Sequence, residues 1–531
     1  MDWGDENMGL KGYTLALSAG LLLLSACNSD SGTETAGEDG EQTSGGTLNI
    51  AYGANPQTLD PHLTTNQSTR DVSRQIFEQL LVLNEQYEVV PSLAESFDIS
   101  EDGLTYTFEL REGVTFHNGK ELAAEDVVAS MDKWLEGSTQ GRANLQGAEF
   151  VEVDPLTVEL HLDEPSLIGP NILADTAPFP AIMPKEIIEE AGPEGVDEYI
   201  GTGPFQLEEW KVDQYTHLTK YEEYQSREEE PSGLAGRKEA LVDDVYFRYG
   251  SDESTRVAGI TTGEYDIAFN IPSDNADQID NTEGVSNIFN DGGIYSFVFN
   301  KKAGPFADLT FREAFNTAAN YEDFLIAAYG DERFYEVDSA LAITSQVDWH
   351  SEAGSDIYAE RDLEAAKALV EESDYDGEEV VILTTRDYPE QYNMAVVAQQ
   401  LLEDLGVNAK LDVYDWPTVQ ERRTDENNFD LFAVSFAQRP TLHQYPFLAS
   451  TSEYPGWTNN ETIDTLLNEI KAADSLEDAK PTIDALQQEV WDDLPVAKVG
   501  NIQSFVSVRD NVKGYSDLIG PILWNVSVEE E

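Results

Sequence analysis

Apolar and polar residues alternate in an order that predicts a β-turn-α unit between Pro91 and Leu135. Every second residue over 104–110 is apolar, which is the period of a half-buried strand: Leu104, Tyr106, Phe108 and Leu110. After a turn at Asn118-Gly119, apolar residues follow at helical spacing: Val127, Val128, Met131, Trp134 and Leu135. Glu125 and Asp126 lie in the first helical turn, where the helix dipole favours acid. The stretch therefore indicates a protein that mixes strands and helices.

The same periodicities recur along the rest of the chain. They predict strands over 46–52, 157–162, 242–249, 295–300, 380–385, 407–414 and 429–436. They predict helices over 76–83, 306–328 (as a pair), 392–405, 463–470 and 483–494. Because strands and helices alternate between 380 and 436, we expect a parallel sheet there. The fold class is therefore α/β.

Length and charge limit what this protein can be. At 531 residues the chain is too long for one core and suggests two or three domains. It carries 31 Lys plus Arg against 103 Asp plus Glu, a formal net charge of −72, which excludes nucleic acid as a partner. This charge could attract cationic ligands. The acid is spread along the whole chain, so the alternative is a heavily hydrated surface that molar salt screens within about 3 Å. We expect a halophile with an acidic proteome.

The single cysteine, Cys27, follows a short apolar stretch over 13–24 and the sequence Leu24-Ser25-Ala26. This arrangement resembles a bacterial lipobox, in which the thiol accepts lipid after a signal peptidase cuts before it. The apolar run is about half the roughly 20 residues of a membrane span, which disfavours a transmembrane anchor. We therefore predict a lipoprotein signal peptide over 1–27, lipidation of Cys27, and a flexible acidic tether over 28–45. Translation could begin at Met1 or at Met8.

Several further motifs lie before and after the central stretch. They are Leu59-Asp60-Pro61, Gly201-Thr202-Gly203-Pro204-Phe205, Asp252-Glu253-Ser254-Thr255-Arg256 and Gly263-Glu264-Tyr265-Asp266-Ile267-Ala268. Gln206 stands where a dinucleotide-binding GxGxxG motif needs its third glycine. Together, over about 46–524, the motifs resemble those of the family 5 extracellular solute-binding proteins. These are the peptide-, nickel- and oligosaccharide-binding components of ABC importers.

The resemblance implies a specific architecture and specific partners. It implies a two-lobed periplasmic-binding-protein type II fold with an extra subdomain in the first lobe and a hinged ligand cleft. The expected boundaries are 46–292 for the first lobe, 293–500 for the second, and 501–531 for a return to the first. The expected protein is an extracytoplasmic monomer without a cofactor. It would be anchored to the outer face of the cell membrane by lipid and would deliver solute to an ABC permease and its ATPase.

No catalytic motif stands out in the sequence. The six histidines form no HExxH, there is no GxSxG elbow, and no phosphate loop has the right spacing. No spacing of His and carboxylates supports a metal site either. We therefore predict a binding protein and not an enzyme, with an extracellular hydrolase as the alternative from another class.

Ligands of α/β sheets bind beyond the carboxyl ends of the strands. The loops at those ends, with one later segment, contain the candidate ligand-binding residues: Tyr52, Asn55, Arg386, Tyr388, Trp416, Arg439, His443 and Trp457. Arg439 is the first choice because a guanidinium pairs with a carboxylate through two hydrogen bonds. A structural salt bridge is its alternative role. Trp416 and Trp457 could stack on a ligand or pack in a core, and Arg386 could pair with local acids.

The loop around Arg439 departs from the family pattern. Where relatives often have GRPDPD, this chain has Gln438-Arg439-Pro440-Thr441-Leu442-His443, so the acid that can hold a ligand's amino group is missing. We predict capture of an oligopeptide or peptide-like solute by closure of two lobes. A nickel chelate or an oligosaccharide is the alternative ligand.

Overall fold

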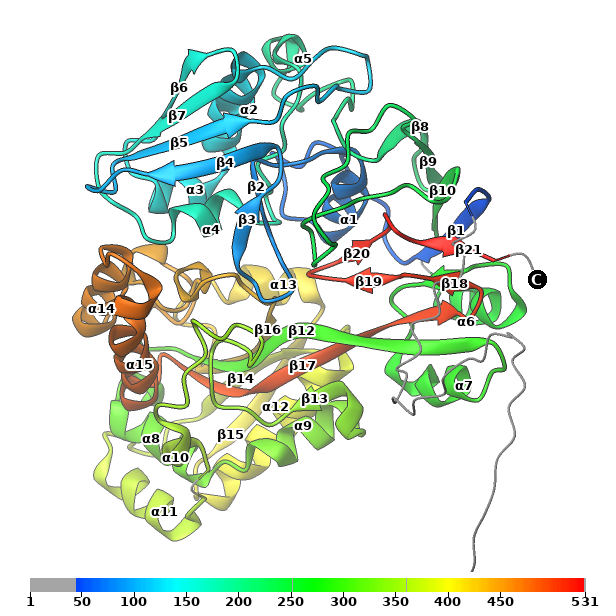
Figure 1. Cartoon of the computed structure of the whole chain (residues 1–531). Helices are drawn as coiled ribbons and strands as arrows, with labels where there is room; N and C mark the ends of the chain where they lie inside the picture. The colour runs from blue at the N-terminus through cyan, green and yellow to red at the C-terminus, as the bar shows by residue number, and fades with distance from the viewer. Residues whose placement is uncertain (1–43, 251, 360, 530–531) are drawn as a thin grey trace, which may run out of the picture. The chain divides into compact units, whose positions relative to one another are not determined.

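A mixed sheet of eleven strands organises the chain (Figure 1). The computed structural model describes residues 44–250, 252–359 and 361–529. The strand order is β15-β14-β16-β12-β17-β11-β1-β10-β9-β8, and β13 (Tyr335–Glu336) pairs with β17 beside this path. We call the β8-to-β11 end, which includes β1, the first half and the β14-to-β16 end the second half. The predicted signal peptide, Cys27 and nearly all of the tether lie outside the described residues.

In the first half, β1 pairs in parallel with β10 and β11, and β8 and β9 form a hairpin. The strands are β1 (Thr47–Tyr52), β8 (Phe205–Lys211), β9 (Tyr215–Lys220), β10 (Asp244–Tyr249) and β11 (Ile267–Ala268). The helices are α1 (Gln67–Ile76), α6 (Glu253–Thr262) and α7 (Ala276–Asp280). The predicted turn before β8 needs glycine, because a Cβ on Gly201 would lie 2.1 Å from the carbonyl oxygen of Ile76.

In the second half, β14 lies between two strands that are both parallel to it, which confirms the predicted parallel sheet. The strands are β14 (Val380–Thr385), β15 (Ala409–Tyr414) and β16 (Leu431–Phe436). The helices are α8 (Leu309–Ala318), α9 (Tyr321–Tyr329), α10 (Ser355–Ala359), α11 (Leu363–Glu372), α12 (Pro389–Asp404), α13 (Trp416–Arg422), α14 (Glu461–Lys471) and α15 (Leu476–Asp493). Buried phenylalanines, among them Phe297 and Phe315, fill the core against the sheet.

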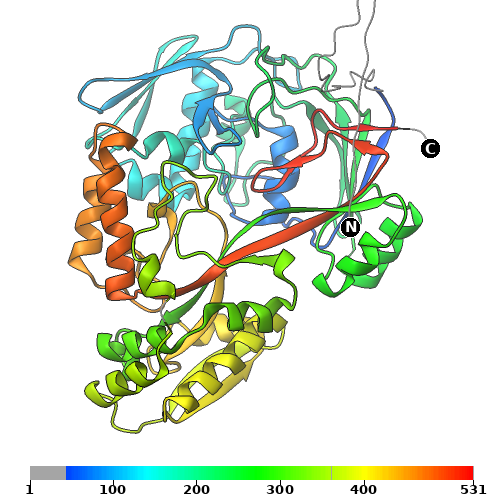
Figure 2. The same cartoon turned by 60° about the horizontal axis from the view of Figure 1, so that its bottom comes forward.

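Two long antiparallel strands, β12 (Val285–Phe299) and β17 (Val496–Arg509), run from one half into the other (Figures 1 and 2). Their register slips twice. Gly292 has no partner on β17, and Val499 has no partner on β12 because Tyr295 pairs with Gly500 and Ser296 with Lys498. Such bulges bend a strand locally and increase its twist. The predicted strand over 295–300 is therefore only the last third of a longer element.

A further layer covers one side of the first half (Figure 1). It contains a four-stranded sheet in the order β4 (Ala94–Ile99), β5 (Thr105–Leu110), β7 (Thr157–His161) and β6 (Glu149–Asp154). Its helices are α2 (Ala124–Gly137), α3 (Thr139–Asn144), α4 (Gly169–Leu173) and α5 (Lys185–Glu190). The predicted β-turn-α unit is β5 and α2, whose Phe108 and Trp134 are buried in one core. The prediction is confirmed.

Short pairs complete the fold: β2 (Leu81–Leu83) with β3 (Val89–Pro91), β18 (Val512–Lys513) with β21 (Ser527–Val528), and β19 (Ser516–Asp517) with β20 (Pro521–Ile522). The predicted helix over 76–83 is wrong, because α1 ends at Ile76 and the apolar run that follows forms β2. The last helix starts earlier than predicted, since Ser475 caps it and Pro481 lies inside it. Within the described ranges, no helix is both long and apolar enough to cross a membrane.

Candidate functional site

The carboxyl ends of β15, β14 and β16 meet at one edge of the second half, where four of the candidate residues lie. Arg386 and Tyr388 follow β14, Trp416 follows β15, and Arg439 follows β16. Because these strands are neighbours and parallel, the loops that follow them emerge on the same side of the sheet. This edge is the candidate site.

Arg439 has an unused guanidinium. The residue is half-buried, and its Nε atom is fully buried without a hydrogen-bond partner. Within the described ranges, the side chain forms neither a hydrogen bond nor an ion pair, so the alternative of a structural salt bridge is not what the structure shows. The backbone carbonyl, by contrast, accepts a hydrogen bond of 2.8 Å from Nε2 of Gln346. The loop is therefore fixed while its charged group remains available.

Asp175, in the segment that follows α4, lies close enough to Arg439 for the two charges to interact. It is 3% exposed, and its Oδ1 accepts hydrogen bonds from the backbone N–H groups of Thr176 (2.6 Å) and Ala177 (3.2 Å). Its Oδ2 accepts one of 2.5 Å from Nε2 of Gln444, which lies in the loop after β16. Burial raises the pKa of Asp175, and the charge of Arg439 is the largest influence opposing that rise.

Gln438 places an unpaired acceptor beside the unpaired guanidinium. The residue is 4% exposed, and its Nε2 donates to Oε1 of Gln346. Its own Oε1 is buried without a partner. An amide oxygen that accepts and a guanidinium that donates thus stand on successive residues. They are suited to a ligand that presents an N–H next to a carbonyl or carboxylate.

Aromatic rings line the edge next to these polar groups. Tyr388 is 40% exposed and meets Trp416 edge to face, with ring centres 5.2 Å apart. The backbone N–H of Trp416 donates to Asp387 at 2.7 Å, which ties the β15 loop to the β14 loop. The guanidinium of Arg423 lies 5.9 Å from the Trp416 ring. The arrangement offers exposed aromatic surface for a ligand's apolar part.

The side chains of Arg386 and His443 already bind other groups of the protein. Arg386 is exposed, stacks on Tyr392 at 3.8 Å and donates to its hydroxyl at 2.5 Å, so an aromatic ring takes the place of the expected acids. His443 donates from Nε2 to the carbonyl of Leu467 at 2.8 Å. Burial lowers the pKa of His443 to about 4, so its ring is neutral near pH 7.

The other candidates lie elsewhere. Tyr52 is 2% exposed, packs on Phe247 and donates from its hydroxyl to Asp71 at 2.6 Å, which favours a packing role. The ring of Trp457 stacks on Phe429, with centres 5.8 Å apart, and Lys302 covers it at 4.6 Å. Asn55 is half-buried and its Oδ1 has no partner.

One cavity lies near this edge, and a larger groove lies away from it. A cavity of about 210 Å³ separates the β2–β3 turn and α4 from the loop around Gln346, and Tyr87, Asn171 and Trp349 also line it. A larger groove of about 660 Å³ lies between α2 and α5 and shares none of the candidate residues. In the described part of the chain, no three His, Cys, Asp or Glu side chains come together to hold a metal ion.

Asp175, Gln438 and Gln346 belong to this site, although no sequence pattern predicted them. Asp175 lies in a proline-rich loop without periodicity, and its partner Gln444 is 269 positions away. Gln438 was visible only as a neighbour of Arg439. No local pattern would have found the set.

Comparisons with known proteins identify the family and the fold. Residues 88–458, more than half of the chain, match the model of the bacterial extracellular solute-binding proteins, family 5 (Middle). A probable peptide ABC transporter periplasmic-binding protein, y4tO of Sinorhizobium fredii, is 28% identical over 495 residues, which are 89% of this chain and 92% of the relative.

Two solved structures share the fold. The substrate-binding protein CtaP of Listeria monocytogenes has a TM-score of 0.78 at 22% identity, over 89% of this chain and 96% of that one. The oligopeptide-binding protein AppA of Bacillus subtilis, in complex with a nonapeptide, has a TM-score of 0.73 at 20% identity, over 92% and 100%. The fold is the two-lobed type II periplasmic-binding-protein fold, as expected. The relatives are binding proteins and not enzymes. The chain belongs to family 5 of the bacterial extracellular solute-binding proteins.

Proposed function

We propose that this protein is the substrate-binding component of an ABC importer and captures an oligopeptide or a peptide-like solute outside the cytoplasm. The observation that carries the proposal is the half-buried, unpartnered guanidinium of Arg439. A buried donor without a partner is costly, and a ligand carboxylate or carbonyl that pairs with it recovers that cost. Arg439 is therefore the anchor for the ligand's acceptor group.

Charge balance narrows the ligand further. Arg439 compensates the buried carboxylate of Asp175. A purely anionic solute that engaged Arg439 would leave Asp175 without that compensation, which is unfavourable in a buried site. A solute that also brings an ammonium group or N–H donors avoids this cost, and Oε1 of Gln438 can accept one such N–H. Peptides carry all of these groups.

The aromatic pair Tyr388 and Trp416 would contact a side chain of the ligand. Names of relatives support the peptide assignment, since the Sinorhizobium fredii protein is named as a probable peptide transporter component and the Bacillus subtilis structure holds a nonapeptide. A nickel chelate or an oligosaccharide is the alternative cargo.

Capture would proceed by closure of two lobes, over 46–292 and 293–500, with 501–531 returning to the first. β12 and β17 are the long strands that both lobes share, so we place the hinge there. The closed form would then be recognised by the permease and its ATPase. We further propose a monomer that lipid on Cys27 anchors to the membrane, with the tether over 28–45 between anchor and body. Its acidic surface suits a halophile.

Native mass spectrometry of protein purified from its host in high salt tests the proposal, followed by identification of the released solute. We expect short peptides. Arg439→Ala should lower affinity for them by about 100-fold. Arg361→Ala is the matched control, because the side chain of Arg361 is 51% exposed and its ion pair among the described residues is with Asp323, at 3.5 Å. It should bind like the unaltered protein.

The outcomes separate the parts of the proposal. A single non-peptide solute or a metal chelate would overturn the peptide assignment and leave a binding protein. Equal affinities of Arg439→Ala and Arg361→Ala would show that Arg439 is not the anchor. Empty protein that also binds nothing in a thermal-shift screen of di- to pentapeptides would overturn peptide capture.

A further inference from the structure

A lysine is buried in β17 beside one of the two register slips. Lys498 is 1% exposed and pairs with Ser296 of β12, and the next residue, Val499, is the one without a partner there. The carbonyl of Val499 accepts a hydrogen bond of 2.9 Å from the hydroxyl of Tyr358. A full charge therefore lies beside the slip, where β12 is still paired with β16 of the second half.

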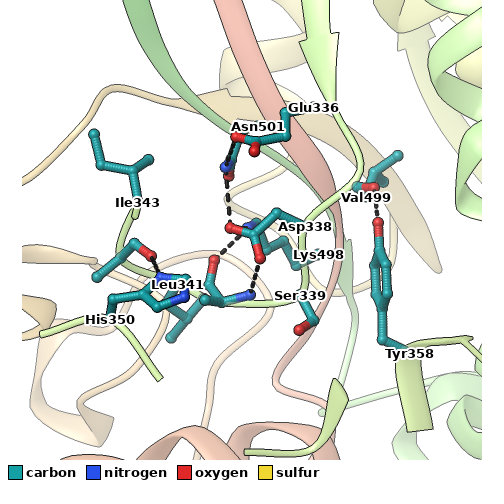
Figure 3. A network of polar contacts seen from close by, with 12 residues as sticks. Glu336, Asp338, Ser339, Leu341, Ile343, His350, Tyr358, Lys498, Val499 and Asn501 are labelled. Atoms are coloured by element: carbon teal, nitrogen blue, oxygen red, sulfur yellow. Dashed lines mark hydrogen bonds and ion pairs between the residues drawn. The ribbon is translucent and has the colours of Figure 1, made fainter. Parts of the chain in front are cut away.

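The ammonium of Lys498 binds the segment that follows β13 (Figure 3). Its Nζ lies 3.4 Å from Oδ2 of Asp338 and donates to the carbonyl of Ala340. Asp338 in turn accepts from the backbone N–H of Ala340 at 3.1 Å and from Nδ2 of Asn501 at 3.0 Å. The same Nδ2 donates to Glu336 at 3.1 Å. Lys498 and Asn501 thus hold this segment against β17 from both sides of the slip.

The segment held in this way leads directly to the candidate site. Three residues after Asp338, the carbonyl of Leu341 accepts from the hydroxyl of Tyr445 at 3.2 Å. Gln346, five residues further on, donates to the carbonyl of Arg439 at 2.8 Å. Residues 338–346 therefore connect β17 to the loop that carries the unpaired guanidinium.

A buried lysine is an expensive way to hold a segment in place. Burial lowers the pKa of Lys498 to about 8, which measures the cost of keeping its charge away from water. Burial also tends to raise the pKa of Asp338, but Lys498 and the hydrogen bonds from Ala340 and Asn501 lower it below the usual value. Well-packed apolar residues are often more stabilising than a buried ion pair. The pair therefore contributes defined geometry more than stability.

We propose that Lys498 is a positioning residue for the solute-binding loop. By holding Asp338 and the carbonyl of Ala340, it fixes residues 338–346, and through Gln346 it fixes the backbone that presents Arg439. Movement at the slip in β17 is thereby coupled to the geometry of the site. The coupling exists whether or not a solute is bound, and only its effect on affinity rests on the proposed function.

Hydrogen–deuterium exchange of the ligand-free protein tests the coupling without any solute. Lys498→Met keeps the length of the side chain and removes its donors. We expect amide exchange in 338–346 and in 438–445 to rise by about fivefold or more. Lys238→Met is the matched control, because Lys238 is also buried (7% exposed side chain) and pairs with Glu78 at 2.8 Å in the first half. It should raise exchange near Glu78 only.

Affinity provides the second measurement. Lys498→Met should weaken binding of the solute that the unaltered protein retains by about tenfold, and it should also lower the midpoint of urea unfolding, because it leaves the largely buried Asp338 without its charged partner. A purely structural lysine would lower the midpoint without changing affinity. Asp338→Asn is the milder variant if Lys498→Met fails to fold, because it keeps the shape and removes the charge.

The two measurements distinguish the two proposals. If exchange rises only within β17, or equally in the Lys238→Met control, the positioning role is overturned. If exchange rises as expected but no peptide is retained by the unaltered protein, the coupling stands and the peptide function fails. If exchange rises and affinity for a retained solute does not change, the segment does not position Arg439.

Discussion

Two arginines, one in each half, are held in opposite ways. Arg74 on α1 is 7% exposed, and its terminal nitrogens donate to three successive carbonyls of the C-terminal segment, those of Leu518 (3.0 Å), Ile519 (3.0 Å) and Gly520 (2.9 Å). In the described chain, the terminal nitrogens of Arg439 bind nothing. Both Nε atoms are buried without a partner, so the difference lies in the terminal nitrogens alone.

The difference teaches which buried arginine serves structure and which serves a ligand. Arg74 ties residues more than 440 positions apart, and both of its terminal nitrogens have carbonyl partners. Burial and the nearby charge of Arg70 lower its pKa to about 10, yet its carbonyl partners hold it in place. Arg439 carries the same chemistry on a fixed backbone with no protein group to receive it. An unsatisfied group on a rigid loop is what a ligand can complete.

The largest expected effect is that the two arginine variants differ in opposite ways. Arg74→Ala should lower stability more than Arg439→Ala, and Arg439→Ala should lower affinity more than Arg74→Ala. Arg74→Ala leaves the carbonyls of Leu518 and Ile519 without donors, while that of Gly520 keeps the N–H of Leu518, and should lower the free energy of unfolding by about 3 kcal/mol. Arg439→Ala removes a group without hydrogen-bond partners, but it also takes the opposing charge away from the buried Asp175, so it should lower the free energy of unfolding by only about 1 kcal/mol. Urea unfolding of the ligand-free variants in high salt measures both.

Affinity should show the reverse order. Arg74→Ala should bind the retained solute normally wherever it is folded, since its partners belong to the C-terminal segment. If Arg439→Ala proved as destabilising as Arg74→Ala, the guanidinium would be a structural group and the comparison would fail.

Sequence periodicity predicted the strands and helices because it is local. The apolar residues of β5 repeat every two positions and those of α12 every three to four, and neighbouring residues determine such patterns. The rule that ligands bind beyond the carboxyl ends of strands led to Arg439 and Trp416 in the same way. The same rule also selected Tyr52, at the end of β1, and could not tell that its hydroxyl already donates to Asp71 within the protein.

The partners in the site could not be predicted, because they come from distant segments. Asp175 meets Gln444 across 269 positions, and Gln346 meets Arg439 across 93. The sequence of each segment alone is that of an ordinary polar loop. The fold decides which loops come together, and so whether an arginine meets three carbonyls, as Arg74 does, or none, as Arg439 does. A local sequence pattern does not contain that information.

Acidic pH should reduce the stability of both halves through one buried histidine in each. The loss per histidine should be smaller than the loss expected for Arg74→Ala. Burial lowers the pKa of His443, in the Arg439 loop, and of His62, in the first half, to about 4. The unfolded chain protonates near pH 6.5, so it binds more protons than the folded state as pH falls from 6.5 to 4. Stability is therefore full above 6.5 and is lost as the pH falls towards 4.

Between pH 7 and pH 5 each of these histidines should cost about 2 kcal/mol of unfolding free energy. Unfolding at a series of pH values measures the slope, and His443→Gln should flatten it by one histidine's share, because Gln can still donate to the carbonyl of Leu467. His161→Gln is the control, since the side chain of His161 is 44% exposed. An unchanged slope in His443→Gln would mean that the Arg439 loop opens locally and protonates before the protein unfolds.

The smallest expected effect concerns Tyr52, which the sequence placed among the ligand contacts. Tyr52→Phe removes the hydroxyl that donates to Asp71 at 2.6 Å and keeps the ring that packs on Phe247 and Phe269. Because Asp71 keeps Arg70 as a partner, with 2.8 Å between Nη2 and Oδ1, we expect a loss of about 1 kcal/mol of stability. Affinity for the retained solute should not change, as isothermal titration can measure. A clear loss of affinity without a loss of stability would show that Tyr52 contacts the ligand and does not serve packing in the first half. The contrast between the two halves would then rest on Arg439 alone.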